Sequence, residues 1–382
     1  MSVKPGSLGG ESGVGEELGV GQDTAFRGDR TDEQALTGAT SSPRPSRRGL
    51  LAALAILALL VLAPLLGLPS WLVFLFTVAF AKGLVVLGVV LLLRGDLVSF
   101  GHGLYYAIGA YAAGLALRAG FPLRDAFPLA VLGALAGAVL ASIVGLFLAR
   151  YRGIFFGMLS TAFSMILYSL LLKLYWLTGG TDGIAVRVSS TLGLQPPADL
   201  IRLTQYYFVL ALVVGSVYLA YRVAASPLGY LMRGINDNEI RVEYMGASVR
   251  RAIYRTYVLS GALGGLGGAL TAITVGHIAP DLAYWTASGE FVFIALLGGS
   301  GSVFAPFVGA GVFELVRNYA QKASPYTWQM LLGSVLLVII LFAPGGLWSV
   351  FERLVGRRPT GSAGGPEKRP AKERRWALSS KR

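Results

Sequence analysis

Long apolar runs, each close to the length of a membrane span, recur through the middle of this chain. An α-helix needs about 20 apolar residues to cross about 30 Å of hydrocarbon, where its backbone must be hydrogen-bonded internally. The runs are continuous rather than alternating, which excludes a β-barrel. We therefore expect an all-α polytopic integral membrane protein with about 10 transmembrane or half-membrane helices. The candidate spans are 49–68, 71–93, 97–117, 127–149, 153–177, 206–223, 253–275, a short 288–299, 302–320 and 328–347.

Composition agrees with this class and divides the chain into three parts. Hydrophobic residues make up 54% of the 382 residues and charged residues only 14%, which lies outside the range of soluble globular domains. Residues 1–48 are rich in Gly, Ser and Thr with few apolar side chains, so we expect a disordered polar tail. The membrane domain is expected over 49–351, and residues 352–382 form a basic tail.

The basic residues serve first as topology signals. The net charge of +13 would suggest nucleic acid for a soluble protein, but here Arg and Lys cluster beside span ends and in the tails. Under the positive-inside rule these clusters face the cytoplasm. For the basic C-terminal tail, contact with anionic lipid headgroups is the alternative to a simple orientation signal. Both termini and the polar stretch 226–251 then share the cytoplasmic side only if 288–299 counts as a crossing or another segment does not cross. The sequence leaves these two possibilities open.

A polar island, residues 226–251, interrupts the apolar sequence. Leu228, Leu231, Met232 and Ile235 follow the i, i+3, i+4, i+7 spacing of a helix with one apolar and one charged face. Such a segment between spans is a docking platform for a partner protein, or alternatively only a solvated loop.

A second short helix is expected within the polar island. Asn236 can cap it, Glu239 then takes the third helical position of a capping box, and Gly246 supplies the left-handed residue that ends it. The polar island is thus expected to contain two short helices.

Motifs of catalysis are missing from the sequence. It contains no GxxxxGK[ST] phosphate loop, no HExxH and no GxSxG, so we expect a protein that is not an enzyme and takes nucleotide energy only from a partner. The chain has no cysteine, which excludes disulfides and thiolate metal sites, and we expect neither a metal nor a cofactor. The glycine-dense stretch 261–270 lies in an apolar span and indicates close helix packing.

Polar side chains within spans are costly and are candidates for function. The set comprises His102, His277, Lys82, Lys173, Glu290 and Glu314. For each one the structural alternative is strong, because a lysine near a span end extends to the headgroups and a lone histidine commonly bonds a neighbouring carbonyl.

Three glycine-containing breaks interrupt the spans, at 99–103, 178–183 and 298–302. Interrupted helices present backbone groups and helix-end dipoles to a cavity, which is how transporters bind zwitterions such as amino acids. An ordinary turn at a helix end is the alternative. The residues predicted to line a substrate path are His102, Tyr105, Tyr106, Thr178 and Thr181.

Six motifs in order resemble one family. They are SFGHGLYYAIGAY (99–111), GIFFGMLSTAFSMILY (153–168), LTGGTDGI (177–184), the E-x-x-G of 243–246, LLGGSGSVFAPFVGA (296–310) and FAPGGLW (342–348). Together they resemble the LivM-type permease subunit of branched-chain amino-acid ABC transporters, over about residues 70–350. Residues 103–106 are bulkier than the family's usual small set, which leaves the substrate open.

The resemblance implies a subunit that works with several partners. They are a second homologous permease subunit, two cytoplasmic ATPase subunits and an extracytoplasmic solute-binding protein, in a bacterial plasma (inner) membrane with both termini cytoplasmic. The resemblance implies no nucleic-acid partner. It implies import of Leu, Ile or Val through a permease domain over 49–351, with 226–251 as its cytoplasmic coupling loop. The predicted ATPase-coupling residues are Leu228, Leu231, Arg233, Ile235, Asp237, Glu239, Glu243 and Gly246.

Two alternatives stay open. The same architecture also carries urea, a small amide or a sugar. A stand-alone secondary transporter driven by an ion gradient would need no coupling loop.

Overall fold

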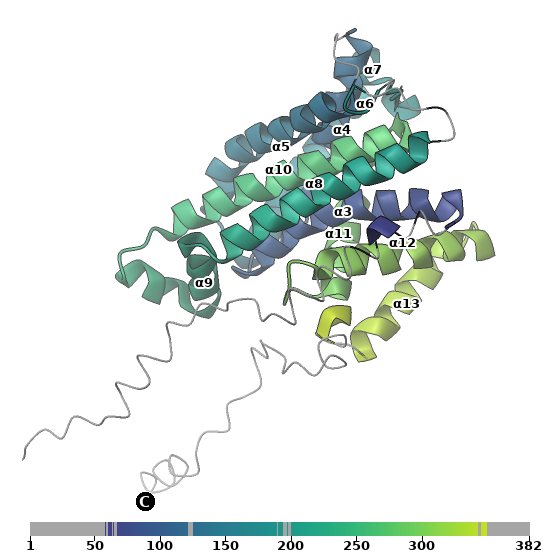
Figure 1. The fold of residues 1–382 in the computed structure, drawn as a ribbon. Helices are drawn as coiled ribbons and strands as arrows, with labels where there is room; N and C mark the ends of the chain where they lie inside the picture. Colours follow the sequence, from purple (N-terminus) through teal and green to yellow (C-terminus); the bar gives the residue numbers. More distant parts are fainter. Residues whose placement is uncertain are drawn as a thin grey trace, which may run out of the picture. The chain divides into compact units, whose positions relative to one another are not determined.

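Helices account for most of the computed structural model (Figure 1). The structure describes residues 67–120, 125–188, 190–193, 200–342 and 345–349, together with positions 58, 60–62, 64 and 197. All of them belong to the compact unit that begins at Leu54. The two predicted tails and most of the first predicted span lie outside the described residues.

The described elements follow one another in chain order. They are α3 (Ser70–Leu93), α4 (His102–Arg118), α5 (Ala126–Leu148), α6 (Gly153–Lys173), α7 (Tyr175–Thr178), η2 (Gly180–Asp182), β1 (Ile184–Ala185), α8 (Ile201–Ala224), α9 (Pro227–Tyr244), α10 (Val249–Val275), β2 (His277–Ile278), η3 (Pro280–Ala283), α11 (Trp285–Gly298), α12 (Ala305–Ala323) and α13 (Trp328–Phe342).

Among the described residues, five helices are long and apolar enough to cross a membrane: α3, α5, α6, α8 and α10. The same part of the chain has two shorter apolar helices, at Trp285–Gly298 and Trp328–Ile339. The all-α polytopic membrane fold is thereby confirmed. One predicted span was wrong at its end, because the helix expected over 153–177 breaks at Leu174, whose backbone leaves the helical region, and continues as the separate helix α7.

Helix α10 lies at the centre, and its glycines allow this. A Cβ on Gly265 would collide with the backbone of Gly133 and Gly137 in α5, and one on Gly268 would collide with the carbonyl of Tyr106 in α4. Backbones approach this closely only where no side chain intervenes. The close packing predicted for the glycine-dense stretch is confirmed.

Contacts along the long helices fix their directions. Phe80 of α3 packs against Tyr206 of α8. Further along both helices, Leu87 and Ala220 lie in one cluster, so α3 and α8 are parallel. Helix α10 runs the opposite way. In Figure 1 α9 lies at one end of the long helices and α7 at the other, and we refer to these as the α9 end and the α7 end.

Two shorter helices, α4 and α11, start between these ends, and we call them the half-length helices. The N-terminal residue of α4, His102, lies beside Ser260 in the interior of α10, and Gly114 near the end of α4 lies against Ile278 beyond the end of α10. Helix α11 starts beside α4, where Ser288 bonds Gly103. It then runs toward the α9 end, since Val303 soon afterwards lies in one cluster with Leu87 and Leu91 of α3. The two half-length helices therefore point in opposite directions from the level at which Gly103 contacts Ser288. We call this the meeting level.

This arrangement bears on the short segment 288–299. The stretch 277–284 returns from the α7 end to the meeting level, and α11 completes the passage to the α9 end. Together these two segments pass from the α7 end to the α9 end, and α11 alone covers only part of that distance.

At the α7 end, β1 and β2 form a two-stranded antiparallel ladder that pairs Ile184 with Ile278 and Ala185 with His277. It ties the segment after α7 to the segment after α10. His277 is exposed there rather than buried in a span.

Candidate functional site

The polar island forms α9 and the start of α10 at one end of the bundle (Figure 1). Inside α9 the backbone of Asn238 is extended, with φ −165° and ψ 102°, so two short helical stretches meet there. The Asn238 Oδ1 atom accepts from the Arg241 N–H at 2.9 Å. The cap is therefore Asn238 and the prediction of Asn236 was wrong by two residues. Gly246 has the expected left-handed conformation, with φ +84°.

The apolar face of α9 packs on the chain itself. Met232 is 2% exposed and Ile235 is 6% exposed, both within a core cluster that Leu228 and Leu231 border. Ile235 is one of the predicted ATPase-coupling residues; its side chain packs within the chain's own core, and its role toward a partner stays a prediction. The helical spacing identified the buried face correctly, but the surface it covers is intramolecular.

The charged residues of α9 divide into paired and free groups. Arg152 Nε donates to both carboxylate oxygens of Glu239, each at 3.0 Å. This interaction connects α9 to the turn between α5 and α6. Arg233 lies over the Tyr230 ring at 5.9 Å. Burial, and then the neighbouring Arg233, lower the pKa of Arg94 below its ordinary value. The other predicted contacts, Asp237 and Glu243, are exposed.

The polar island also carries a set of large exposed side chains that the sequence pattern did not single out. Tyr244 is 88% exposed and Met245 is 80% exposed, next to the helix-ending Gly246. Tyr230 and Ile240 are also exposed. A group of large exposed apolar side chains on an otherwise polar segment is a candidate contact surface. The signal available in the sequence was the apolar pair directly before the glycine.

The polar island touches the segment that feeds α4. A side chain at Gly95 would collide with the terminal methyl of Met232, and Leu97 belongs to the same core cluster as Met232. Residues 94–101 lead directly into His102, so α9 packs against the segment that immediately precedes α4.

At the start of α4, three predicted path residues lie together and are buried. His102 is 0% exposed, with Nε2 2.7 Å from Ser260 Oγ and Nδ1 3.1 Å from Ser99 Oγ. The Tyr105 hydroxyl donates to the Tyr257 hydroxyl at 2.7 Å. Tyr106 packs edge-on against Phe291 of α11, with ring centroids 5.0 Å apart. In this conformation the three side chains join α4 to α10 and α11.

The other two predicted path residues lie apart, at the α7 end. The Thr178 hydroxyl is buried and donates to the Leu171 carbonyl at 2.6 Å, while Thr181 is exposed. Gly179, Gly180 and Gly183 all have positive φ, so the glycine turn predicted there is confirmed.

Three of the six polar residues predicted within spans, Lys82, Glu290 and Glu314, meet in one cluster. Lys82 Nζ lies 2.6 Å from Glu290 Oε1 and 2.5 Å from Glu314 Oε1, and Arg317 Nη1 lies 3.0 Å from the same Glu290 oxygen. Arg317, three residues after Glu314 on the same helix, was not among the polar residues predicted within spans. Lys173 takes no part, since it is exposed at the end of α6.

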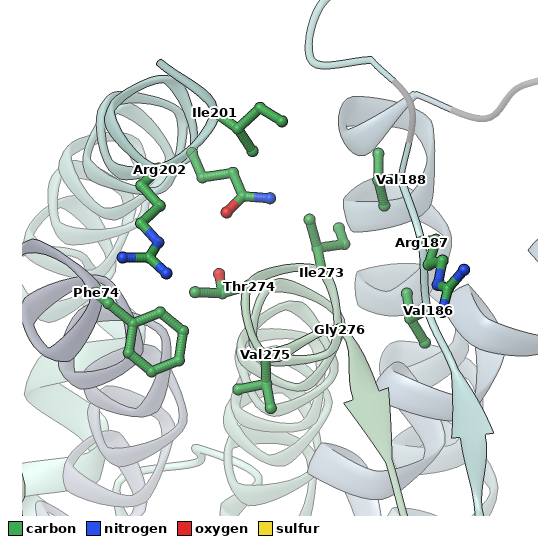
Figure 2. A pocket seen from close by; sticks show the side chains of 11 residues that line it. Phe74, Val186, Arg187, Val188, Ile201, Arg202, Ile273, Thr274, Val275 and Gly276 are labelled. Atoms are coloured by element: carbon green, nitrogen blue, oxygen red, sulfur yellow. The ribbon is translucent and has the colours of Figure 1, made fainter. Parts of the chain in front are cut away.

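A cavity of about 390 Å³ opens at the α7 ends of α3, α8 and α10 (Figure 2). Figure 2 shows the Arg202 guanidinium turned toward Phe74 and Thr274, whereas Arg187 points away from Ile273. None of the predicted path residues lines this cavity. The lining residues are Phe74, Val186, Arg187, Val188, Ile201, Arg202, Gln205, Ile273, Thr274, Val275 and Gly276.

Comparison with known proteins identifies relatives of this architecture. Residues 71–341 match the family model described as "Branched-chain amino acid transport system / permease component". The chain is 30% identical over 283 residues to the "High-affinity branched-chain amino acid transport system permease protein LivM" of Escherichia coli (strain K12), covering 68% of this chain and 65% of that protein. The LivM protein of Salmonella typhimurium (strain LT2) is 28% identical over 285 residues, with the same coverage of 68% and 65%. The chain thus spans less than two thirds of the length of these relatives. No solved structure matches.

Proposed function

The chain belongs to the family of permease components of branched-chain amino acid transport systems, and we propose that it is the permease subunit of an ATP-binding-cassette importer for leucine, isoleucine and valine. The named relatives support the substrate class, because both are described as high-affinity permeases for branched-chain amino acids. The proposed location is the bacterial inner membrane, with the α9 end and both termini on the cytoplasmic side.

The proposed partners are a second homologous permease, two ATPase subunits and an extracytoplasmic binding protein. The observation that carries the proposal is the contact between Met232 of α9 and Gly95. It gives an ATPase bound at the polar island a direct route to the start of α4. Exposed Tyr244 and Met245, with Arg233, Asp237 and Glu243, form the proposed contact surface.

Two connections would transmit the movement. Met232 packs against Gly95 in the segment before α4. The ion pair between Glu239 and Arg152 connects α9 to the turn between α5 and α6. ATP binding closes the ATPase dimer and pushes α9, and the attached helices change their tilt so that the open side of a central path alternates. The partner ATPase supplies the chemistry, and this chain supplies mechanical coupling.

The proposed path runs along α4 from Thr178 and Thr181 at the α7 end to His102, Tyr105 and Tyr106 at the meeting level. Most of these side chains are buried here, so the path opens only when α4 separates from α10 and α11. The hydroxyl groups and the imidazole then become available for the α-carboxylate, while the apolar walls accommodate the side chain.

Uptake of radiolabelled leucine tests the proposal. Vesicles containing this chain and the partners encoded beside it are assayed with and without internal ATP, in competition with urea and ribose. We expect ATP-dependent uptake that excess valine suppresses and urea does not. Uptake of urea or ribose instead of leucine would assign a different substrate to the same architecture. Uptake without ATP would indicate a secondary transporter.

A further inference from the structure

Four charged side chains form a neutral cluster among α3, α11 and α12. Lys82 and Arg317 carry the positive charges, and Glu290 and Glu314 carry the negative ones. Side-chain exposure is 10% for Lys82 and 12% for Glu314. Lys82 lies in the middle of α3, where an unpaired charge would be costly in hydrocarbon. The cluster is therefore maintained against a large desolvation cost.

Within this cluster Glu290 has a special place, because one of its oxygens is shared. Glu290 Oε1 lies 2.6 Å from Lys82 Nζ and 3.0 Å from Arg317 Nη1. Glu290 is the only member of the cluster on α11, two residues after Ser288, which bonds α4. Every charged contact between α11 and its neighbours in the cluster thus passes through this one carboxylate.

The other half-length helix is held in a related way. His102 at the start of α4 bonds Ser260 on the long central helix α10 at 2.7 Å. Glu290 near the start of α11 bonds Lys82 on the long helix α3. Each half-length helix is therefore fixed by a polar link to a long helix from the other half of the chain.

We infer that Glu290 is a positioning residue for transport: through Lys82 and Arg317 it holds the first turns of α11 on α3 and α12, at the level where α11 meets α4. The inference rests on the proposed transport function. Neutralising the buried charges is a requirement of the membrane, whereas holding α11 is the specific role of Glu290.

Two double variants separate these roles because both keep the cluster neutral. Lys82→Met with Glu314→Gln removes the link of α11 to α3 but leaves the Glu290–Arg317 pair, and so keeps the link between α11 and α12. Lys82→Met with Glu290→Gln leaves only Glu314 and Arg317, both on α12, and removes that link. The single variant Lys82→Met leaves one carboxylate in excess, and Lys173→Met at an exposed lysine is the matched control.

The complex with its ATPase partners is assayed for leucine uptake and for thermal stability. We expect Lys82→Met to lose stability and roughly tenfold or more of its maximal uptake rate, since one buried charge is left unpaired. Both double variants should recover stability. Only the Lys82→Met, Glu314→Gln variant should also recover uptake. Equal recovery of uptake by the two double variants would overturn the inference.

Hydrogen exchange in the purified chain provides a readout that does not depend on transport. The amides of α11 should exchange faster in the Lys82→Met, Glu290→Gln variant than in the Lys82→Met, Glu314→Gln variant. Equal exchange would also count against the positioning role. If wild-type vesicles transport no leucine while the exchange difference is present, the proposed function fails and the role of Glu290 in holding α11 remains.

Discussion

The backbone N–H of Gly103 donates to Ser288 Oγ at 2.8 Å, and this bond joins the starts of the two half-length helices. Both residues are buried. Because α4 and α11 run in opposite directions from this point, their N-terminal dipoles converge on it. The proposed mechanism requires this junction to separate and re-form.

Gly103→Ala should disrupt the junction. The added Cβ would lie 2.7 Å from Ser288 Oγ and 3.1 Å from the Leu282 carbonyl. We expect about 1–3 kcal/mol of destabilisation, as is typical of overpacking, and a loss of uptake. Thermal unfolding of the purified complex measures the first effect. Gly215→Ala in α8 is the control, because nothing lies within 4 Å of its Cβ; equal effects of the two changes would contradict the prediction.

His102 and Ser260 should be energetically coupled, since their side chains bond at 2.7 Å in a buried site. In a double-mutant cycle with His102→Ala and Ser260→Ala, we expect a coupling free energy of about 1 kcal/mol in unfolding. Additive effects would mean that the bond contributes nothing. The exposed His277, changed to Ala, should leave stability within about 0.5 kcal/mol of wild type.

Met245→Asp should detach the ATPase without unfolding the permease, because Met245 is 80% exposed. Ile235→Asp should instead destabilise the chain itself, because Ile235 is 6% exposed and a buried unpaired carboxylate is costly. Co-purification with the ATPase and thermal unfolding are measured for both. Retention of the ATPase by the Met245 variant would remove this residue from the contact surface.

Asp125 caps α5 and should make stability depend on pH. Burial alone would raise the pKa of this carboxyl, but hydrogen bonds from the Phe127, Gly193 and Leu192 N–H groups and from Ser190 lower it below the ordinary 3.8. Its stabilising contribution is therefore complete above the ordinary value and is lost as pH falls through the lower folded-state pKa. The free energy of unfolding, measured between about pH 6 and 3, should decrease as the pH falls, and this decrease should be smaller in Asp125→Asn. An identical decrease in both proteins would exclude Asp125 as its source.

The orientation can be tested with single thiols, because the native chain has no cysteine. Asn236 and Thr181 are exposed at opposite ends of the bundle. In intact cells an impermeant maleimide should label Thr181→Cys but not Asn236→Cys, and lysis should expose the second. The reverse pattern would invert the proposed topology.

The sequence alone determined the class of fold and the positions of most helices. This was possible because a span is a local property: a run of apolar residues such as that of α3 must be helical in hydrocarbon, whatever surrounds it. The helical spacing of Met232 and Ile235 likewise identified a buried face of α9, and the glycines of α10 indicated close packing. These signals need no knowledge of distant residues.

The tertiary structure decided which groups those features meet. Spacing could not show that the apolar face of α9 covers this chain's own core, or that Glu239 pairs with Arg152. Nor could it bring Lys82 to Glu290 and Glu314, which lie 208 and 232 residues away along the chain. Such contacts depend on the directions and levels of packed helices, and those follow from the sum of many contacts along α10 rather than from any local pattern.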